Sequence, residues 1–450
     1  MELFVRIKIT AISALFGFLF GFDTGVMTSA LPFLTTQFSL SNFMEGLVVS
    51  VVPLAAVAGT VWGLKTADTM GRIKVLLISA ILFALGALGS AAAPEASVLL
   101  AARLLLGFAI GASTLVAPIY LAEIAPAKYR GAVVGTFQLM ITIGILFAFV
   151  SGLAFSPGQD WRAMFAIGVI PAGLCIVGVL LVPETPRWLL MQGQIKDARR
   201  VLENITPKDE LAEIDEAMAG SEAEKEKETG VEGWQVFKLA GVRFALLFVI
   251  ATFVLAPLTG INAVLTYAPA IFSNAGFSGS NAQFLATIGL GVINVAVTVV
   301  MMSLVDRFGR RPLFITGFAG AASSCVLVAA SYAIGEPLQT YGALVGLLAM
   351  IVFFGVGIGP MAYIYASELF PLSVRAKGYG IASMVFWMTN FILLLVFPVV
   401  LAAAGGVGSF IMFTGFCLIG LLFAVKYAPE PKGTVLERVD DEIERVFKGK

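Results

Sequence analysis

Two stretches, Asp68-Thr-Met-Gly71-Arg72 and Asp306-Arg-Phe-Gly309-Arg310-Arg311, place the same charged, glycine-containing turn in each half of the chain. Glu123 follows the first turn, Glu368 follows the second, and a Pro-Glu pair comes last in each series. The two series keep the same order at a period of roughly 240 residues, which indicates two homologous halves. Because both copies are expected on the same side, the repeat is parallel rather than inverted.

The composition is that of a membrane protein. Of the 450 residues, 59% are hydrophobic and 13% are charged, and the mean hydropathy is +0.94. A soluble domain cannot bury so much apolar surface, whereas a lipid bilayer can. Lys+Arg and Asp+Glu are both 29, so the net charge points to no partner, and no nucleic acid is expected. The chain has no histidine, which excludes imidazole metal sites and histidine proton relays.

Twelve apolar runs are long enough to cross the bilayer as helices, which needs about 20 residues each. They occupy roughly 8–30, 46–66, 73–93, 99–122, 131–153, 163–183, 241–273, 284–304, 311–334, 339–367, 378–402 and 406–427. The sequence therefore predicts an all-α membrane protein with a first six-helix bundle at 1–183 and a second at 241–427. A cytoplasmic linker at 184–240 is expected to hold short helices at 195–205 and 209–219, and residues 428–450 form a cytoplasmic tail.

The basic residues predict the orientation in the membrane. Lys and Arg gather in the loops after the second, fourth, eighth and tenth runs, in the linker and in the tail, whereas the opposite loops hold only Arg162. The positive-inside rule then puts both termini in the cytoplasm of a multi-pass cell-membrane protein.

The repeated charges are expected to form a latch at the cytoplasmic face, which stabilises one conformation and breaks in another. The alternative is that they serve only as positive-inside charges, but two ordered copies with acidic partners favour the latch. Its candidate residues are Asp68, Arg72, Glu123, Arg130, Glu184, Arg187, Asp306, Arg310, Glu368, Arg375 and Glu430.

Over essentially its whole length, the chain resembles the sugar porter family of the major facilitator superfamily. The matching stretches are Gly21 to Val26, Asp68 to Arg72, Glu123 to Gly131, Pro183-Glu-Thr-Pro-Arg187-Trp188, Gly260-Ile-Asn262, Asp306 to Arg311, Gly359-Pro360, Glu368 to Arg375 and Pro429-Glu-Pro-Lys-Gly433. The resemblance implies two six-helix bundles around a central cavity that opens alternately to either side. It also implies transport of a monosaccharide or polyol, and we expect the chain to act as a monomer.

Two ionisable residues lie inside apolar runs, Asp23 in the first and Arg103 near the start of the fourth. Charges inside a membrane are costly and usually functional or paired. A carboxylate stays ionised beside an arginine and takes up a proton when moved away, which is the minimum needed for proton coupling. The symporters of the family look similar at both positions. The xylose–proton symporter has a further acid where this chain has Gly168. The alternative is a static structural ion pair.

Polar and aromatic side chains within the apolar runs are the candidates for substrate binding. They are Gln138, Asn262, Tyr267, Asn294, Tyr363, Trp387 and Asn390. Amides both donate and accept hydrogen bonds, which suits sugar hydroxyls, and an indole face suits the apolar side of a pyranose. Except for Tyr363, they match positions that line the sugar cavity in the family. Individually, each could instead join helices.

The chain departs from the family at five positions. Ala256 and Pro257 replace the usual Gln-Gln, Tyr363 replaces a tryptophan, Phe386 replaces a polar residue, and Phe137 replaces an asparagine. The cavity is therefore expected to be more apolar than a standard hexose site. Three interpretations remain open: a sugar or polyol held by fewer contacts, a less polar substrate such as a cyclic polyol or aromatic acid, and a chain altered by engineering.

The leading hypothesis is a secondary transporter that moves a monosaccharide or polyol together with a proton. The alternatives are an uncoupled facilitator of the same substrates and a nutrient sensor that no longer transports. An enzyme is not expected, because the chain has no histidine, cysteine cluster or nucleophile motif. No phosphate-binding loop is present, and no cofactor or metal is expected.

Overall fold

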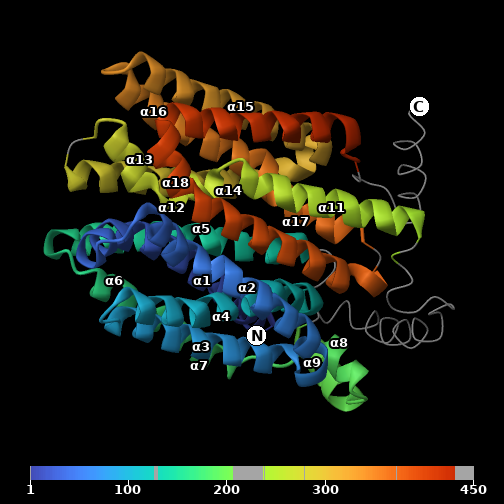
Figure 1. Cartoon of the computed structure of the whole chain (residues 1–450). Coiled ribbons are helices and arrows are strands. Elements are labelled where there is room, and N and C mark those ends of the chain that lie inside the picture. Colours follow the sequence, from blue (N-terminus) through green and yellow to red (C-terminus); the bar gives the residue numbers. More distant parts are fainter. Residues whose placement is uncertain are drawn as a thin grey trace.

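The structure is a computed structural model that describes residues 2–125, 130–205, 237, 239–277, 279–370 and 372–430. Every regular element in these ranges is a helix (Figure 1). The linker residues 206–236 and the tail residues 431–450 lie outside the described part, so the helix expected at 209–219 and most of the tail stay predictions.

The first half contains five long helices and a sixth, broken one. They are α1 (Glu2–Phe38), α2 (Asn42–Met70), α3 (Arg72–Ala92), α4 (Ala96–Ile124), α5 (Arg130–Phe155) and the pair α6 (Trp161–Ala166) and α7 (Val169–Val179). Each covers one of the predicted runs. The sixth run ends four residues earlier than expected, because the chain leaves the helix after Val179 and enters the Pro-Glu segment.

Two short helices follow, α8 (Pro186–Met191) and α9 (Ile195–Ile205). Thr185 caps α8, since its hydroxyl accepts a hydrogen bond from the Trp188 amide. The bounds of α9 agree with the helix predicted at 195–205, and an Arg199–Glu203 ion pair at 3.2 Å has the expected spacing of four residues.

The second half repeats the pattern with more interruptions. Its elements are α11 (Ala240–Leu258), α12 (Ile261–Thr266), α13 (Ala268–Asn274), α14 (Ser280–Phe308), α15 (Arg310–Ile334), α16 (Leu338–Phe353), the π-helical turn η5 (Phe354–Ile358), α17 (Gly359–Glu368) and α18 (Leu372–Tyr427). α18 contains the last two predicted runs in one element, and its backbone leaves helical geometry at Gly405, where φ is +63°. The twelve runs are thus all helical.

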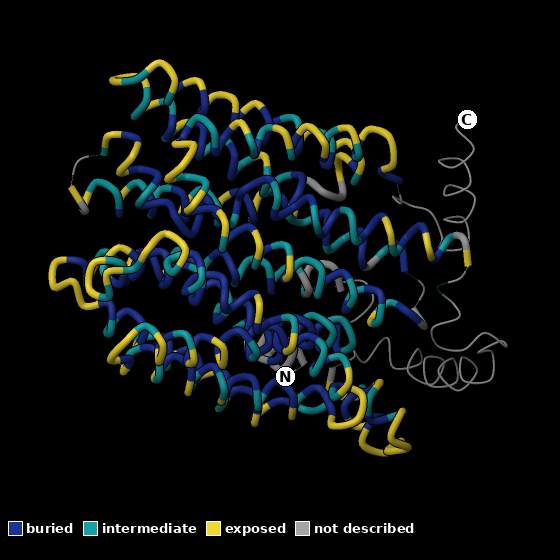
Figure 2. The backbone as a smooth tube through the Cα atoms, in the orientation of Figure 1, coloured by how far each residue is buried: buried dark blue, intermediate teal, exposed yellow. Residues whose placement is uncertain are grey.

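The halves meet along two long contacts. Within the first half, α1 packs on α5 while α2 and α3 pack on α4; within the second, α15 packs on α16 and α18. Between the halves, α2 lies against α18 and α5 against α14 (Figure 1). Figure 2 shows the buried residues toward the middle of the bundle and many exposed ones on its outside. Ile170, Leu180 and Leu422 are among the exposed apolar residues, as expected of helices that face lipid.

Candidate functional site

Two adjacent cavities lie between the halves. Asp23, Thr24 and Arg103 from the first half and Asn262, Thr266 and Asn390 from the second are among the residues that line one of them, which we call the polar cavity. The other, the aromatic cavity, is smaller and is lined by Phe137, Phe253, Tyr363 and Tyr379 among others. Phe20, Phe386 and Trp387 line both.

Asp23 and Arg103 form a buried ion pair in the wall of the polar cavity. Arg103 Nη1 donates to Asp23 Oδ1 at 3.4 Å, and the two side chains are 2% and 5% exposed respectively. Arg103 Nε donates to the Val48 carbonyl at 2.9 Å, which fixes the guanidinium between α1 and α2. The carboxylate thus has its counter-ion and also lines the polar cavity.

Gly168 packs closely against Phe22, the residue that precedes Asp23 on α1. A Cβ atom there would lie 2.7 Å from Phe22 Cε1 on α1. Glycine therefore lets α1 approach the turn between α6 and α7.

The break between α11 and α12 brings an amide to the cavity. Pro257 removes the hydrogen bond to the Phe253 carbonyl, and Gly260 follows with φ at +92°, a backbone conformation that favours glycine. α12 then starts in a new direction and presents Asn262. Asn262 Nδ2 donates to Asn390 Oδ1 on α18, and Asn390 Nδ2 donates to the Phe386 carbonyl at 3.0 Å.

Trp387 separates the two cavities. Its ring meets Phe20 at 5.3 Å and Phe386 at 5.4 Å, both edge to face. The residue is 4% exposed, and its Nε1 has no hydrogen-bond partner among the described residues. An indole N–H buried without an acceptor is costly, so this atom is a donor available to a ligand.

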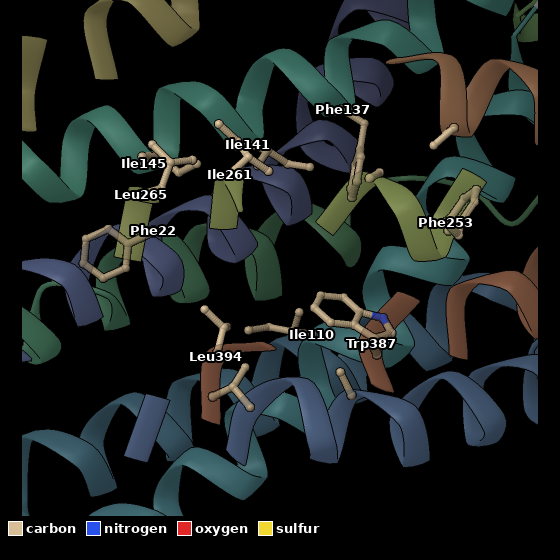
Figure 3. Packing of buried hydrophobic residues seen from close by; sticks show 14 of the residues in the cluster. Phe22, Ile110, Phe137, Ile141, Ile145, Phe253, Ile261, Leu265, Trp387 and Leu394 are labelled. Carbon is tan, nitrogen blue, oxygen red and sulfur yellow. The ribbon is translucent and has the colours of Figure 1, made fainter. Parts of the chain in front are cut away.

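The aromatic cavity is held by ring contacts. Phe253 lies 5.6 Å from Tyr363, 6.1 Å from Tyr379 and 5.9 Å from Phe386, each edge to face. Figure 3 shows Phe137, Phe253 and Trp387 arriving from separate helices around this region. Tyr363 stands where the family has a tryptophan, and it contributes a ring and a hydroxyl to the wall.

Six of the predicted ligand and coupling residues come together at the cavities. Asp23, Arg103, Asn262, Trp387 and Asn390 line the polar cavity, and Trp387 with Tyr363 lines the aromatic one. Gln138, Tyr267 and Asn294 are not among the residues that line either cavity. The Tyr267 hydroxyl donates instead to the Leu394 carbonyl at 2.9 Å, joining α12 and α13 to α18.

Several lining residues were missed by the sequence analysis, although periodicity could have found them. Phe20, Thr24 and Met27 occur with Asp23 at positions i, i+3, i+4 and i+7, on one face of α1. On α18, Tyr379 and Ser383 precede Phe386 and Trp387 by whole turns. Asp23, a charged residue inside an apolar run, therefore identifies the face of α1 that lines the polar cavity.

The predicted charge cluster of the first half is present at the turn between α2 and α3. Arg72 binds Glu123 through two hydrogen bonds of 3.0 Å and contacts Asp68 Oδ1 at 3.1 Å. Glu184 accepts a hydrogen bond of 3.0 Å from the Ile73 amide at the start of α3. Thr185 donates to Glu123 Oε2 at 2.6 Å, which ties the Pro-Glu segment to the same carboxylate.

The second half repeats this cluster between α14 and α15. Arg310 Nη2 lies 2.8 Å from Glu368 Oε1. Glu430 accepts from the amides of Arg310 and Arg311, each at 3.0 Å. A repeated tyrosine, missed in the sequence, completes both copies: Tyr120 donates to the Pro183 carbonyl at 2.8 Å and Tyr365 to that of Pro429 at 3.0 Å.

The other four predicted members of the latch are Arg130, Asp306, Arg375 and Arg187. The side chains of Arg130 and Asp306 lie outside the described part. Arg375 Nε donates to the Phe370 carbonyl at 3.2 Å, within the turn between α17 and α18. Arg187 is exposed in α8, and none of the described hydrogen bonds or ion pairs joins it to the cluster. Within the described residues, no group of three or more histidine, cysteine or acidic residues could hold a metal ion.

The chain is similar to known membrane carriers along nearly its full length. Residues 9–443 match the family described as Sugar (and other) transporter. The Galactose-proton symporter of Escherichia coli (strain K12) is 36% identical over 434 residues, which is 95% of this chain and 92% of the symporter. The D-xylose transporter of Levilactobacillus brevis is 36% identical over 431 residues, with 95% and 93% covered.

Solved structures agree with the described architecture. The proton:xylose symporter XylE bound to 6-bromo-6-deoxy-D-glucose is 27% identical, with a TM-score of 0.82 and with 98% of this chain and 99% of that one covered. A partially occluded, inward-open conformation of XylE from E. coli is 27% identical, with a TM-score of 0.83 and 96% and 99% covered. XylE belongs to the major facilitator superfamily, so the predicted fold is confirmed.

Proposed function

The chain belongs to the sugar transporter family, and on that premise we propose that it carries a monosaccharide or related polyol across the cell membrane with a proton. The observation that carries this proposal is the shared cavity. Asp23 and Arg103 open onto the same space as Asn262, Asn390 and Trp387. A proton bound at Asp23 and a sugar bound to the amides therefore occupy one compartment and can influence each other.

The Asp23–Arg103 pair supplies the charge change that coupling requires. With Asp23 ionised, the pair is neutral overall; a proton on Asp23 leaves Arg103 as an uncompensated buried cation. A new arrangement of the helices that gives the Arg103 cation another partner or access to water then becomes more favourable. Protonation at Asp23 thus biases the bundle between two conformations, and a bound sugar biases the same equilibrium.

Alternating access needs contacts between the halves that form and break. One such contact lies in the described structure: the buried Thr28 hydroxyl donates to the Leu265 carbonyl at 3.1 Å, joining α1 to α12. The charge clusters around Arg72 and Arg310 lie at the ends of α2 and α14 and hold the connecting turns. We propose that these clusters act as the cytoplasmic latch, which stabilises one conformation and breaks in the other.

The orientation and assembly are also proposals. The charge clusters lie in the loops richest in Lys and Arg, which the positive-inside rule places in the cytoplasm together with both termini. One chain supplies both halves of the cavity, so a monomer suffices for transport. The division at 1–183, 184–240, 241–427 and 428–450 follows the elements and stays a prediction.

Uptake into proteoliposomes tests the proposal. Vesicles with the purified chain and an inward proton gradient are given labelled D-xylose, D-galactose, D-glucose or myo-inositol. We expect at least one of them to accumulate above its external concentration, and to equilibrate without accumulating once an ionophore removes the gradient. Uptake that never exceeds equilibration would instead favour an uncoupled facilitator.

A paired substitution locates the coupling. Asp23→Asn removes the titrating carboxylate and is expected to abolish accumulation while sparing counterflow exchange. Asp160→Asn is the matched control, because Asp160 is exposed and only caps α6 through the Ala163 amide at 3.0 Å, which asparagine can also do. Undiminished accumulation in Asp23→Asn would overturn the coupling role.

A further inference from the structure

We propose that the preferred substrate is a monosaccharide ring that carries an apolar substituent, and that the aromatic cavity receives this substituent. The inference rests on the proposed transport of monosaccharides and goes further by naming the class of sugar. A deoxy carbon and a small aglycone share this chemistry, and the experiment below distinguishes them.

The wall of the aromatic cavity combines apolar side chains with hydroxyl groups and one indole N–H. Its rings and aliphatic side chains come from Phe20, Phe137, Ile141, Phe253 and Phe386. Its polar atoms are the hydroxyls of Thr114, Tyr363, Tyr379 and Ser383 and the N–H of Trp387. The Thr114 hydroxyl already donates to the Ile110 carbonyl at 2.8 Å. Neither an amide side chain nor a charge lines this cavity in the described part of the chain.

A sugar hydroxyl that points at the phenyl rings of this wall is poorly placed. Each ring hydroxyl turned toward a phenyl face loses its hydrogen bonds to water and gains none, which weakens binding by about ten-fold for one lost bond. A methyl or aryl group at the same place loses nothing and buries apolar surface against the rings. The cavity therefore discriminates between two versions of one sugar that differ in a single substituent.

The polar cavity next to it provides what the hydroxyls need. Asn262 and Asn390 lie there together with the Asp23–Arg103 pair, and Trp387 forms the boundary. The unpartnered Nε1 of Trp387, on a residue that is 4% exposed, is a donor at that boundary. A ligand with a hydroxyl-rich side and one apolar substituent therefore matches the two cavities taken together.

Two phenylalanines give the aromatic wall much of its apolar character. Phe137 and Phe386 stand where sugar porters have an asparagine and a polar residue, and both form the aromatic wall. Ala256, at one of the two usual glutamine positions, is buried and brings no side-chain hydrogen bond.

Competition between matched ligands tests the proposal on the full chain in lipid nanodiscs. The pairs are D-glucose with 6-deoxy-D-glucose, D-galactose with 6-deoxy-D-galactose, and D-glucose with phenyl β-D-glucoside. Tryptophan fluorescence reports the dissociation constant of each. We expect the apolar member of at least one type of pair to bind about ten-fold more tightly than its parent. A preference confined to the deoxy sugars identifies a methyl-sized substituent, and one confined to the phenyl glucoside identifies an aglycone.

Two variants connect the preference to the cavity. Phe386→Asn adds an amide to the wall and is expected to bring each pair to near-equal affinity, whereas Tyr363→Phe keeps the ring, removes a hydroxyl and is expected to keep or increase the preference. Phe43→Asn, at an exposed position of α2, is the control and should change neither. If Phe386→Asn does not fold, the affinities of the ligand pairs for the parent chain and for Tyr363→Phe still test the proposal.

The failure of this inference differs from failure of the proposed function. Parent sugars that bind as tightly as their apolar derivatives, or more tightly, overturn the inference while transport of monosaccharides stands. No binding and no uptake for any member of the three pairs overturns both.

Discussion

The two halves of this chain carry nearly the same charged groups at the turns between α2 and α3 and between α14 and α15, and they differ at the centre of the bundle. At the turns, Arg72 pairs with Glu123 as Arg310 pairs with Glu368. At the centre, the first half supplies the charges Asp23 and Arg103, and the second supplies amides and most of the aromatic rings. The repeated part builds the scaffold, and we propose that the part that is not repeated binds the substrate and the proton.

The largest effect is expected at the unrepeated charge. Arg103→Gln leaves Asp23 buried without its counter-ion, which destabilises a protein by about 3–5 kcal/mol. Thermal unfolding in detergent measures the loss as a lower Tm. A proton on Asp23 removes the unpaired charge, so the loss should shrink as the pH falls. A Tm equal to that of the parent chain at every pH would show that the pair contributes nothing to stability.

The two arginine clusters should differ in strength although they match in design. The Arg72 side chain is 5% exposed and Arg310 is 14%, while their partners Glu123 and Glu368 are 8% and 29% exposed. Arg72→Ala is therefore expected to cost about 2–4 kcal/mol and Arg310→Ala about 1–2 kcal/mol, measured as Tm shifts. Salt should reduce the Arg310 effect more. Equal losses with equal salt dependence would mean that burial does not distinguish the halves.

The glycines of the two turns should behave alike. Gly71 has φ at +95° and Gly309 at +87°, and a Cβ atom at either would collide with the carboxylate of Glu184 or Glu430. Alanine at either position is expected to cost about 1–3 kcal/mol. Gly173→Ala, where a Cβ meets no other atom, is the control for thermal unfolding. A large loss at one turn with none at the other would break the equivalence.

The smallest effects are expected from the repeated tyrosines. Tyr120→Phe and Tyr365→Phe each remove one hydrogen bond to a proline carbonyl and keep the ring, so each should lower stability by about 1 kcal/mol. Both variants and their combination are compared by Tm. Additive losses are expected because the two residues lie in different halves; a combined loss that differs from the sum would reveal coupling between the clusters.

The fold was predictable because hydropathy and charge repeat on the scale of whole helices. The runs gave the long helices, and α9 was found from its spacing of charged residues. Two breaks in the helices differ in this respect. The kink at Gly405 in α18 falls between the last two predicted runs. The interruption after α11, which depends on the combination of Pro257 with Gly260, falls inside a single predicted run. Such local geometry is determined by packing between helices that a single sequence does not specify.

The site was predictable to the extent that polarity inside an apolar run is costly. Asp23, Arg103, Asn262 and Asn390 were found for that reason and line one cavity. Gln138 and Asn294 carry the same signal but do not line the two cavities, because the rotation of a helix about its axis is determined by its neighbours. Aromatic lining residues such as Tyr379 were missed because an aromatic residue in an apolar run cannot be distinguished by sequence from one that packs in the core.

The most direct test of the division between the halves measures substrate affinity and proton influx in the same proteoliposomes for Asp23→Asn and Asn262→Ala. We expect Asp23→Asn to bind substrate within about three-fold of the parent chain and to move no protons. We expect Asn262→Ala to bind at least ten-fold more weakly, while each transported sugar still brings the same number of protons. Loss of substrate binding in Asp23→Asn, or an altered proton-to-sugar ratio in Asn262→Ala, would contradict the account.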